Sequence, residues 1–285
     1  MNNKLVYDIG MHLGFDTKMY IEKGYKVIAV EANEFLVRKG MKKFKNEIEA
    51  RKLQIINCAI SEMDNQKLSF FISEADQESS INEQMARNGG NVKVQEVISY
   101  KLSTLFKKYG VPHYCKIDIE GYDNIALKTL QGDTDLLPQY ISAEINNLSD
   151  DGIVSRQIDD ENELLKLWTS TLDTLKELGY NKFKLVDQYS LQVFDKNSSY
   201  LNSGLYFGTS FLRKLINKYL RVTTCLKFCF SFNRSYLRGS SGPFGKELKG
   251  KWEDYDVTKE NIISHTKKGL TYGKKLMWCD LHASL

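Results

Sequence analysis

The stretch that decides the fold is KLVYDIGMHLGFDT, residues 4–17. Its first five residues are rich in β-forming side chains, which predicts a strand that ends at Asp8. Gly10 and Gly14 then mark a turn, and the residues from Thr17 to Lys23 are compatible with a helix that stops at a further glycine. The stretch therefore predicts a strand, a glycine-spaced turn and a helix in direct succession.

Short apolar strands and helical patterns alternate through much of the remaining chain. The expected strands cover residues 26–30, 53–59, 114–119 and 140–145, and the expected helices lie near residues 33–44, 102–108 and 125–130. This alternation predicts an α/β fold with a doubly wound, mostly parallel sheet. Apolar residues at helical spacing from Leu164 to Leu175 predict one more helix, ending at Gly179. Runs at 182–186 and 204–210 are candidates for two late strands that complete the sheet.

Length and composition describe an ordinary folded chain. With 285 residues, 42% of them hydrophobic, 27% charged and only three Pro, the chain is neither collagenous nor mucin-like nor broadly disordered. We expect one domain over residues 1–210 and a basic C-terminal extension over residues 211–285. Residues 61–100 are more polar than a single crossover needs, which predicts an inserted hairpin and loop within the domain.

Charge and cysteine usage exclude several classes. The net charge of +4 is too small to indicate a nucleic-acid-binding protein. Five cysteines without a CxxC pair indicate neither a disulfide framework nor a zinc module, and they fit a reducing cytoplasm. We find no apolar run of the ~18 residues that a membrane span needs and no secretion signal, so we expect a cytoplasmic protein. Residues 211–238 form a basic, amphipathic segment that either docks on its own domain or contacts an anionic membrane surface.

The turn after the first strand carries the chemistry of a binding site. Gly10 and Gly14 let the backbone turn tightly and approach a ligand, and Glu31, at the end of the next strand, is placed to accept hydrogen bonds from two ribose hydroxyls. The GxGxxG pattern of dinucleotide folds is absent. Asp8 and Asp16 would repel a pyrophosphate and favour a cationic ligand. S-adenosylmethionine, which has a ribose, an ammonium and a sulfonium but no phosphate, fits these features better than NAD or FAD.

A second motif is YCKIDIEGYD, residues 114–123. Its apolar strand delivers Asp118 to the carboxyl end of the sheet, the edge at which open α/β sheets bind ligands. Glu120 begins the next loop. Acids at these two positions are suited to hold an ammonium group or a substrate hydroxyl, although capping of the following helix is the structural alternative.

These motifs together resemble one enzyme family. The strings DIGMHLGFDT (8–17), VIAVEAN (27–33), NCAIS (57–61) and KIDIEGYD (116–123) are similar to the successive motifs of FkbM-type methyltransferases, a branch of the class I enzymes that use S-adenosylmethionine. SGPFG (241–245) and the end of the chain also resemble tails of that family. The resemblance implies the strand order 3-2-1-4-5-7-6 and methyl transfer, most often to an oxygen of a sugar, glycan or other natural product.

The resemblance also implies which residues contact the cofactor. Asp8, Gly10 and Gly14 would shape the methionine end, Glu31 would hold the ribose, and residues 57–59 would face the adenine. The full implied set is Asp8, Gly10, His12, Gly14, Asp16, Thr17, Glu31, Ala32, Cys58, Ala59 and Asp118. His12 departs from the glycine that many methyltransferases have at its position.

Several questions stay open at the level of sequence. The candidates for a base that accepts the proton of the methyl acceptor are His12, Asp118, Glu120 and Glu144, and spacing singles out none of them. No motif demands a metal, although Asp118, Glu120 and Glu144 are possible ligands for a divalent ion. Two rival functions remain: a nicotinamide-dependent oxidoreductase or epimerase, and a non-catalytic protein that binds membrane or nucleic acid. The expected partner is a small-molecule or glycan acceptor.

Overall fold

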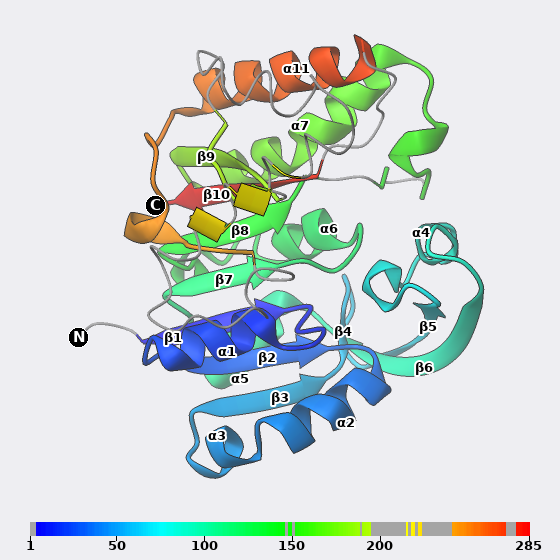
Figure 1. Ribbon diagram of the computed structural model, residues 1–285, viewed down its shortest axis with the longest axis vertical. Coiled ribbons are helices and arrows are strands. Elements are labelled where there is room, and N and C mark those ends of the chain that lie inside the picture. Colours follow the sequence, from blue (N-terminus) through cyan, green and yellow to red (C-terminus); the bar gives the residue numbers. More distant parts are fainter. Residues whose placement is uncertain are drawn as a thin grey trace. The chain divides into compact units, whose positions relative to one another are not determined.

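The computed structural model describes residues 4–145, 148–149, 152–188, 190–194, 215, 218–219, 222–223, 241–271 and 278–285. The largest sheet has seven strands (Figure 1). They are β1 (Leu5–Ile9), β2 (Lys26–Glu31), β3 (Leu53–Asn57), β7 (Tyr114–Ile117), β8 (Tyr140–Glu144), β9 (Lys182–Asp187) and β10 (Cys279–Ser284). Their order across the sheet is β3-β2-β1-β7-β8-β10-β9.

The sheet has the predicted class and is mostly parallel. The pairs β1–β2, β2–β3, β1–β7 and β7–β8 are parallel, and the pair β10–β9 is antiparallel. Counted in chain order within this sheet alone, the strand order is 3-2-1-4-5-7-6. The labels differ from these numbers only because β4, β5 and β6 belong to a second sheet. The doubly wound α/β fold is therefore confirmed.

Different helices cover the two faces of the parallel strands. Tyr20 of α1 (Phe15–Glu22) packs edge-on against Tyr114 of β7, with 5.8 Å between the ring centroids. Tyr7 of β1 points to the other face, where its hydroxyl donates to a carbonyl of α5 (Leu102–Tyr109). Successive side chains of a strand alternate between faces, so the side chains of Asp8 and Lys116 lie on the face that α1 covers.

The remaining helices of this part follow β2, β5 and β7. Asn33 accepts a hydrogen bond from the amide of Phe35 and so caps the first of them, which is the capping role expected from its position. The helices are α2 (Glu34–Lys43), α3 (Lys45–Glu49), α4 (Glu83–Arg87) and α6 (Asp123–Lys128), and short 3-10 turns lie at Asp76–Glu78 and Thr134–Leu136.

Residues 59–100 contain a small second sheet. Its strands are β4 (Ala59–Ile60), β5 (Gln66–Ser73) and β6 (Val92–Tyr100), in the order β4-β6-β5. In Figure 1 this sheet lies beyond the carboxyl ends of β2 and β3. The side chain of Gln95 joins it to the end of β2, because it donates to the carbonyl of Ala32 and accepts from the amide of Glu34.

The chain divides into two compact units, which we describe separately. The first comprises residues 1–143 with 177–179, and the second comprises residues 144–176 with 180–285. The domain boundary expected near residue 210 lies outside the described residues, as does the candidate strand at 204–210. The basic segment 211–238 is described only at residues 215, 218–219 and 222–223. None of the helices in the described residues combines the length and apolar character needed to span a bilayer.

The second unit contains α7 (Glu161–Glu177), α11 (Tyr255–Thr271), β9 and β10, with 3-10 turns at Ser155–Gln157 and Gly245–Glu247. The helix predicted from Leu164 to Leu175 is confirmed as α7, and its apolar face is buried. The end of the chain corrects our expectation, since residues 279–284 form a strand of the large sheet and are not part of an appended extension. This strand is hard to recognise because the polar residues Asp280 and His282 interrupt it, yet all six of its residues are buried.

Burial of His282 makes the stability of the second unit depend on pH. Burial, with a smaller contribution from the Lys184 ammonium, lowers the pKa of His282 from 6.5 to about 3. The unfolded chain therefore binds this proton more readily, and stability is lost as the pH falls from 6.5 towards 3. At pH 5 the expected loss relative to pH 7 is roughly 2 kcal/mol. Urea unfolding of His282→Gln should show a free energy of unfolding that lacks this decrease. An unchanged pH dependence in the variant would contradict the assignment.

Candidate functional site

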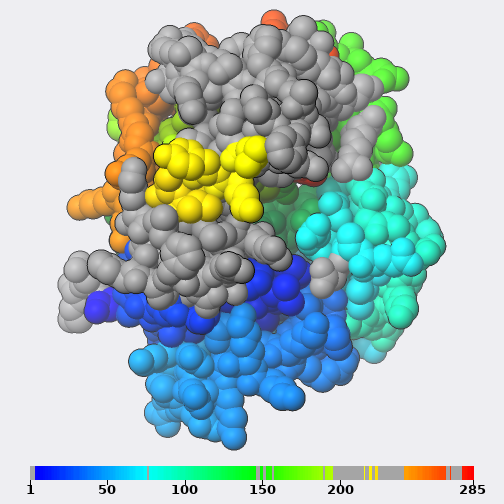
Figure 2. All heavy atoms as spheres, viewed as in Figure 1, coloured from blue at the N-terminus to red at the C-terminus, as the bar shows by residue number. Residues whose placement is uncertain are grey.

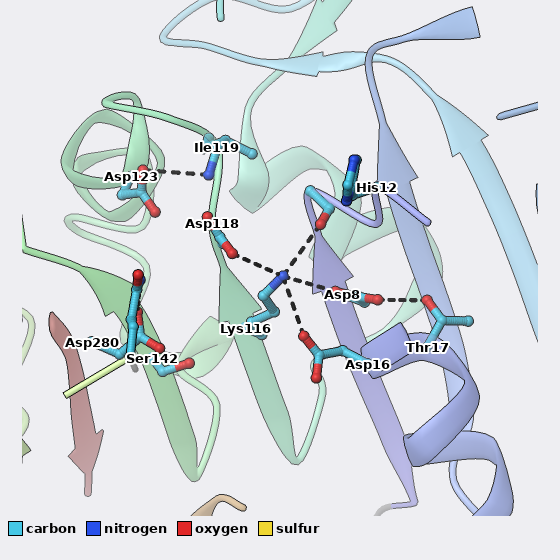
Figure 3. Close-up of polar contacts among 12 residues, drawn as sticks. Asp8, His12, Asp16, Thr17, Lys116, Asp118, Ile119, Asp123, Ser142 and Asp280 are labelled. Carbon is cyan, nitrogen blue, oxygen red and sulfur yellow. Dashed lines mark hydrogen bonds and ion pairs between the residues drawn. The ribbon is translucent and has the colours of Figure 1, made fainter. Parts of the chain in front are cut away.

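A buried lysine lies at the centre of the candidate site. Lys116 of β7 stands opposite Asp8 of β1 in the parallel register, on the face that α1 covers. Its ammonium forms ion pairs with the carboxylates of Asp118 at 3.3 Å, Asp8 at 3.5 Å and Asp16 at 3.6 Å (Figure 3). It also donates to the carbonyl of Gly10 at 3.2 Å. We call Asp8, Asp16, Lys116 and Asp118 the Lys116 cluster.

The Lys116 cluster carries more negative than positive charge. Burial alone would lower the pKa of Lys116, but Asp118, Asp8 and Asp16 together hold it well above its usual value, so the amine stays charged. Burial raises the pKa of Asp8 to about 6, although Lys116 and a hydrogen bond from the Thr17 hydroxyl oppose the rise. By formal charge the cluster combines three carboxylates with one ammonium. Asp8, Asp16 and Asp118, which the motifs assigned to one cofactor site, therefore all lie next to Lys116.

The two glycines of the turn are required by the protein itself. Gly10 has φ of 82°, and a Cβ built there would lie 1.8 Å from the carbonyl oxygen of Asp118. Gly14 has φ of 69°, and its Cβ would meet the ring of Phe44 at 2.6 Å. Sequence analysis attributed these glycines to the approach of a ligand. The structure shows a second reason for each glycine: backbone directly after β7 occupies the place of a Cβ at Gly10, and the ring of Phe44 would have to shift to admit one at Gly14.

Hydrogen bonds to Glu31 connect the turn to the end of β2. Its carboxylate accepts hydrogen bonds from the backbone amides of His12 and Asn33, each at 2.8 Å. Burial raises the pKa of Glu31, and the two backbone donors oppose this rise. Asn57, at the end of β3, donates to the backbone carbonyls of Glu31 and Ala32. The ends of β1, β2 and β3 are thereby held together at the position where a nucleoside was expected.

The side chains of Cys58 and Ala59 do not face solvent. Both are buried, and burial raises the pKa of the Cys58 thiol to about 12. Ala59 packs with Phe70 and Val97 in the core of the second sheet. Any contact of these two residues with a ligand would therefore involve their backbone. The apolar sequence at the end of a strand does not reveal whether the side chain or the backbone would face a ligand. That depends on how the second sheet packs against these residues.

The loop after β7 presents two acids. The side chain of Asp118 is 33% exposed. Glu120 is half-buried and has φ of 51°, and its carbonyl accepts a hydrogen bond from the hydroxyl of Ser80 at 2.8 Å. Burial, followed by the charges of Asp118 and the nearby acids Glu78 and Asp123, raises the pKa of Glu120 well above its usual value. Sequence analysis missed Ser80, because no local pattern signals a contact between residues so far apart in the chain.

The other two candidate residues, His12 and Glu144, have contacts of their own. His12 has φ of 49° and contributes its backbone amide to Glu31. Glu144 ends β8 in the second unit, where it is buried and its carbonyl accepts from the Thr171 hydroxyl. The described residues contain no group of three or more His, Cys, Asp or Glu arranged to hold a metal ion.

Comparisons with known proteins were made for the whole chain. A family model for the methyltransferase FkbM domain matches residues 8–182, which is more than half of the chain. No curated protein matches. A solved structure from Galdieria sulphuraria, described as a sarcosine dimethylglycine methyltransferase, has a TM-score of 0.42 and 11% identity, and the match covers 99% of this chain and 78% of that chain. PKMT2 from Rickettsia typhi, solved in complex with AdoHcy, has a TM-score of 0.35 and 11% identity, with 99% and 49% covered. At these TM-scores the structural similarities carry no argument, and the family match stands by itself.

Proposed function

The chain belongs to the FkbM methyltransferase family, and from this premise we propose that it uses S-adenosylmethionine to methylate a hydroxyl group. The acceptor class that we propose is a sugar, a glycan or another natural product, as the family resemblance implies.

The observation that carries this proposal is the excess of negative charge in the Lys116 cluster. Three carboxylates surround one ammonium, in a place where Asp8, Asp16 and Lys116 are buried. Uncompensated charge in such a place costs free energy, and a cationic ligand would reduce the cost. S-adenosylmethionine carries an ammonium and a sulfonium group. A nicotinamide dinucleotide carries a pyrophosphate instead, which these carboxylates would repel.

The residues present fit this cofactor. Glu31 would hold the ribose, because each of its carboxylate oxygens keeps accepting capacity after its bond to one backbone amide. Asp118, the most exposed acid of the Lys116 cluster, would hold the ammonium of the amino-acid part. The backbone of residues 57–59 would face the adenine. When bound, S-adenosylmethionine supplies a methyl carbon that the positive sulfur makes electrophilic.

The chain itself has two tasks in the proposed reaction. It must hold the acceptor hydroxyl in line with the methyl group, and such positioning can lower a barrier by about 7–11 kcal/mol. It must also accept the hydroxyl proton. We assign that proton to Glu120, because it is half-buried in the same loop as Asp118, which we assign to the cofactor, and because burial raises the pKa of its carboxyl. The candidate roles of His12 and Glu144 stay sequence predictions.

Two variants should separate cofactor binding from proton transfer. Asp118→Asn removes the charge that would pair with an ammonium, and such charged hydrogen bonds are worth about 1.5–3 kcal/mol. We expect it to weaken S-adenosylhomocysteine binding ten- to a hundredfold in calorimetry. Glu120→Gln should bind S-adenosylhomocysteine as the wild type does and transfer methyl groups roughly 10²–10⁴-fold more slowly.

The acceptor for the transfer assay is found with a labelled methyl donor and a fractionated host extract, in which the methylated product is identified by its mass. Asp133→Asn is the matched control, since Asp133 pairs with Lys107 at the surface and not with the Lys116 cluster. Absence of any heat when the wild type meets S-adenosylhomocysteine would refute the proposed cofactor. Normal transfer by Glu120→Gln would refute only the proposed base.

A further inference from the structure

A cavity of about 340 Å³ lies between the turn after β1 and the helix α2. It is lined by His12, Leu13, Phe15, Lys39, Gly40 and Lys43. Helix α2 lies at the surface of the first unit in Figure 2, and its residues Phe35 and Met41 are exposed. The cavity opens to solvent along this helix, because its lining residues Lys39 and Lys43 are exposed.

The charge of this cavity is opposite to that of the Lys116 cluster. Lys39 and Lys43 are four residues apart on α2, so their side chains lie on one face of the helix. Among the residues that the structure describes, neither lysine has a carboxylate within ion-pair distance. Lys18 is the further charged neighbour, and it forms an ion pair with Glu22 of its own helix. The two lysines that border the cavity thus have ammonium groups that no acid neutralises, and the ammonium of Lys39 lies over the ring of Phe35, 4.4 Å from its centroid.

The ammonium of Lys43 is partly removed from water. It donates to the carbonyl of Leu13 at 2.6 Å and lies over the rings of Phe15 and Phe44, at 5.1 and 4.7 Å from their centroids. Burial, with a smaller contribution from Lys18, lowers the pKa of Lys43. An anion next to this group would restore the electrostatic stabilisation that burial removes.

The walls of the cavity are apolar as well as cationic. Leu13 and Phe15 contribute hydrophobic side chains, and the methylene chains of the two lysines add further apolar surface. Gly40 allows α2 to approach the turn closely, because a Cβ there would lie 2.7 Å from the terminal carbon of Met11. A small inorganic anion would interact with the lysines but would make no hydrophobic contact with the apolar walls.

We propose that this cavity binds an organic anion in which a phosphate or carboxylate group is attached to an aromatic ring. The ring would pack against Leu13 and Phe15, and the acid group would lie between the ammonium groups of Lys39 and Lys43. The cavity adjoins the site that we assign to the cofactor, because His12 lines the cavity and its amide donates to Glu31. The cationic groups of the cofactor would be repelled by the two lysines. The proposal does not depend on the proposed methyl transfer.

The test uses the full chain and phenyl phosphate as the probe, with binding measured by calorimetry. We expect saturable binding to the wild type and at least tenfold weaker binding to Lys39→Gln and to Lys43→Gln. Lys42→Gln is the matched control, because Lys42 is an exposed neighbour on α2 that does not line the cavity. It removes the same charge and should leave binding unchanged.

Two further probes examine the two halves of the proposed ligand. Inorganic phosphate should bind at least tenfold more weakly than phenyl phosphate, and benzylamine, which carries the same ring and a positive charge, should not bind. Equal binding of inorganic phosphate, binding of benzylamine, or equal affinities in Lys39→Gln and Lys42→Gln would each overturn the proposal. Lys39 makes no backbone hydrogen bond that shapes the turn, so a thermal midpoint close to that of the wild type is expected for Lys39→Gln. Loss of binding in that variant then reports on the cavity and not on folding.

Discussion

Replacement of Gly10 by alanine should destabilise the protein by roughly 3 kcal/mol or more. A Cβ at positive φ costs about 1–2 kcal/mol, and forcing an atom into an occupied place costs about 1–3 kcal/mol more. At Gly10 both costs apply, because φ is 82° and the new carbon would lie 1.8 Å from the carbonyl oxygen of Asp118. That oxygen belongs to the backbone, so it cannot move aside as a flexible side chain would. The free energy of unfolding in urea measures the loss.

Gly24 provides a closely matched control for this prediction. Its φ is 83°, and a Cβ built there meets nothing within 4 Å. Gly24→Ala should therefore show only the conformational cost of about 1–2 kcal/mol. The difference between the two variants isolates the close approach of the turn to β7. Equal losses of unfolding free energy in the two variants would show that the contact with Asp118 is not the reason why position 10 requires glycine. We also expect Gly10→Ala, but not Gly24→Ala, to lose binding of S-adenosylhomocysteine.

Replacement of Lys116 by methionine should cost about 3–5 kcal/mol at neutral pH, the usual cost of removing one partner from a buried ion pair. Methionine retains most of the volume of lysine but leaves the carboxylates of Asp8, Asp16 and Asp118 to repel one another. The loss should shrink as the pH falls towards 5.5, because burial already raises the pKa of Asp8 to about 6 and protonation of this carboxylate relieves part of the repulsion.

The measurement is the free energy of unfolding of wild type and Lys116→Met at pH 8 and at pH 5.5. The gap between them is expected to be larger at pH 8. Lys107→Met serves as a control, since its ion pair with Asp133 is exposed and should contribute no more than about 1 kcal/mol. Adding Asp8→Asn to Lys116→Met should restore part of the lost stability. If Lys116→Met lost no more free energy of unfolding than Lys107→Met does, the proposal that Lys116 stabilises the buried carboxylates would be contradicted.

The parts of the fold that sequence predicted are those in which neighbouring residues determine the structure. The alternation of short apolar runs with helical patterns predicted β1, β2, β3, β7 and β8, because a buried parallel strand must be apolar on both faces. The strand β10 was missed. Asp280 and His282 make it polar in local sequence, and only its pairing with β9 defines it as a strand. Local composition carries no information about a partner that lies far away in the chain.

In the candidate site, too, some features follow from neighbouring residues and others only from contacts between distant ones. Asp8 and Asp118 were expected near each other, because the carboxyl ends of adjacent parallel strands meet at one edge of the sheet. The reason for Gly10, by contrast, is the carbonyl of Asp118 directly after β7, and the bond from Ser80 to Glu120 connects the segment between β5 and β6 to the loop after β7. Cys58 and Ala59 were expected to face a ligand, and their side chains are buried instead. The contacts of Gly10 with Asp118, of Ser80 with Glu120 and of Ala59 with the second sheet all join residues that belong to different motifs or to none.

The amino-acid sequence by itself determined the strands and helices that local patterns reveal, the acids at the strand ends and the family to which the chain belongs, because these depend on short segments and their spacing. Only the tertiary structure decided which charges surround Lys116, which atoms exclude a side chain at Gly10 and where two lysines of α2 border an apolar cavity. Charge balance and close packing depend on distances in space, and those distances exist only after distant segments have come together.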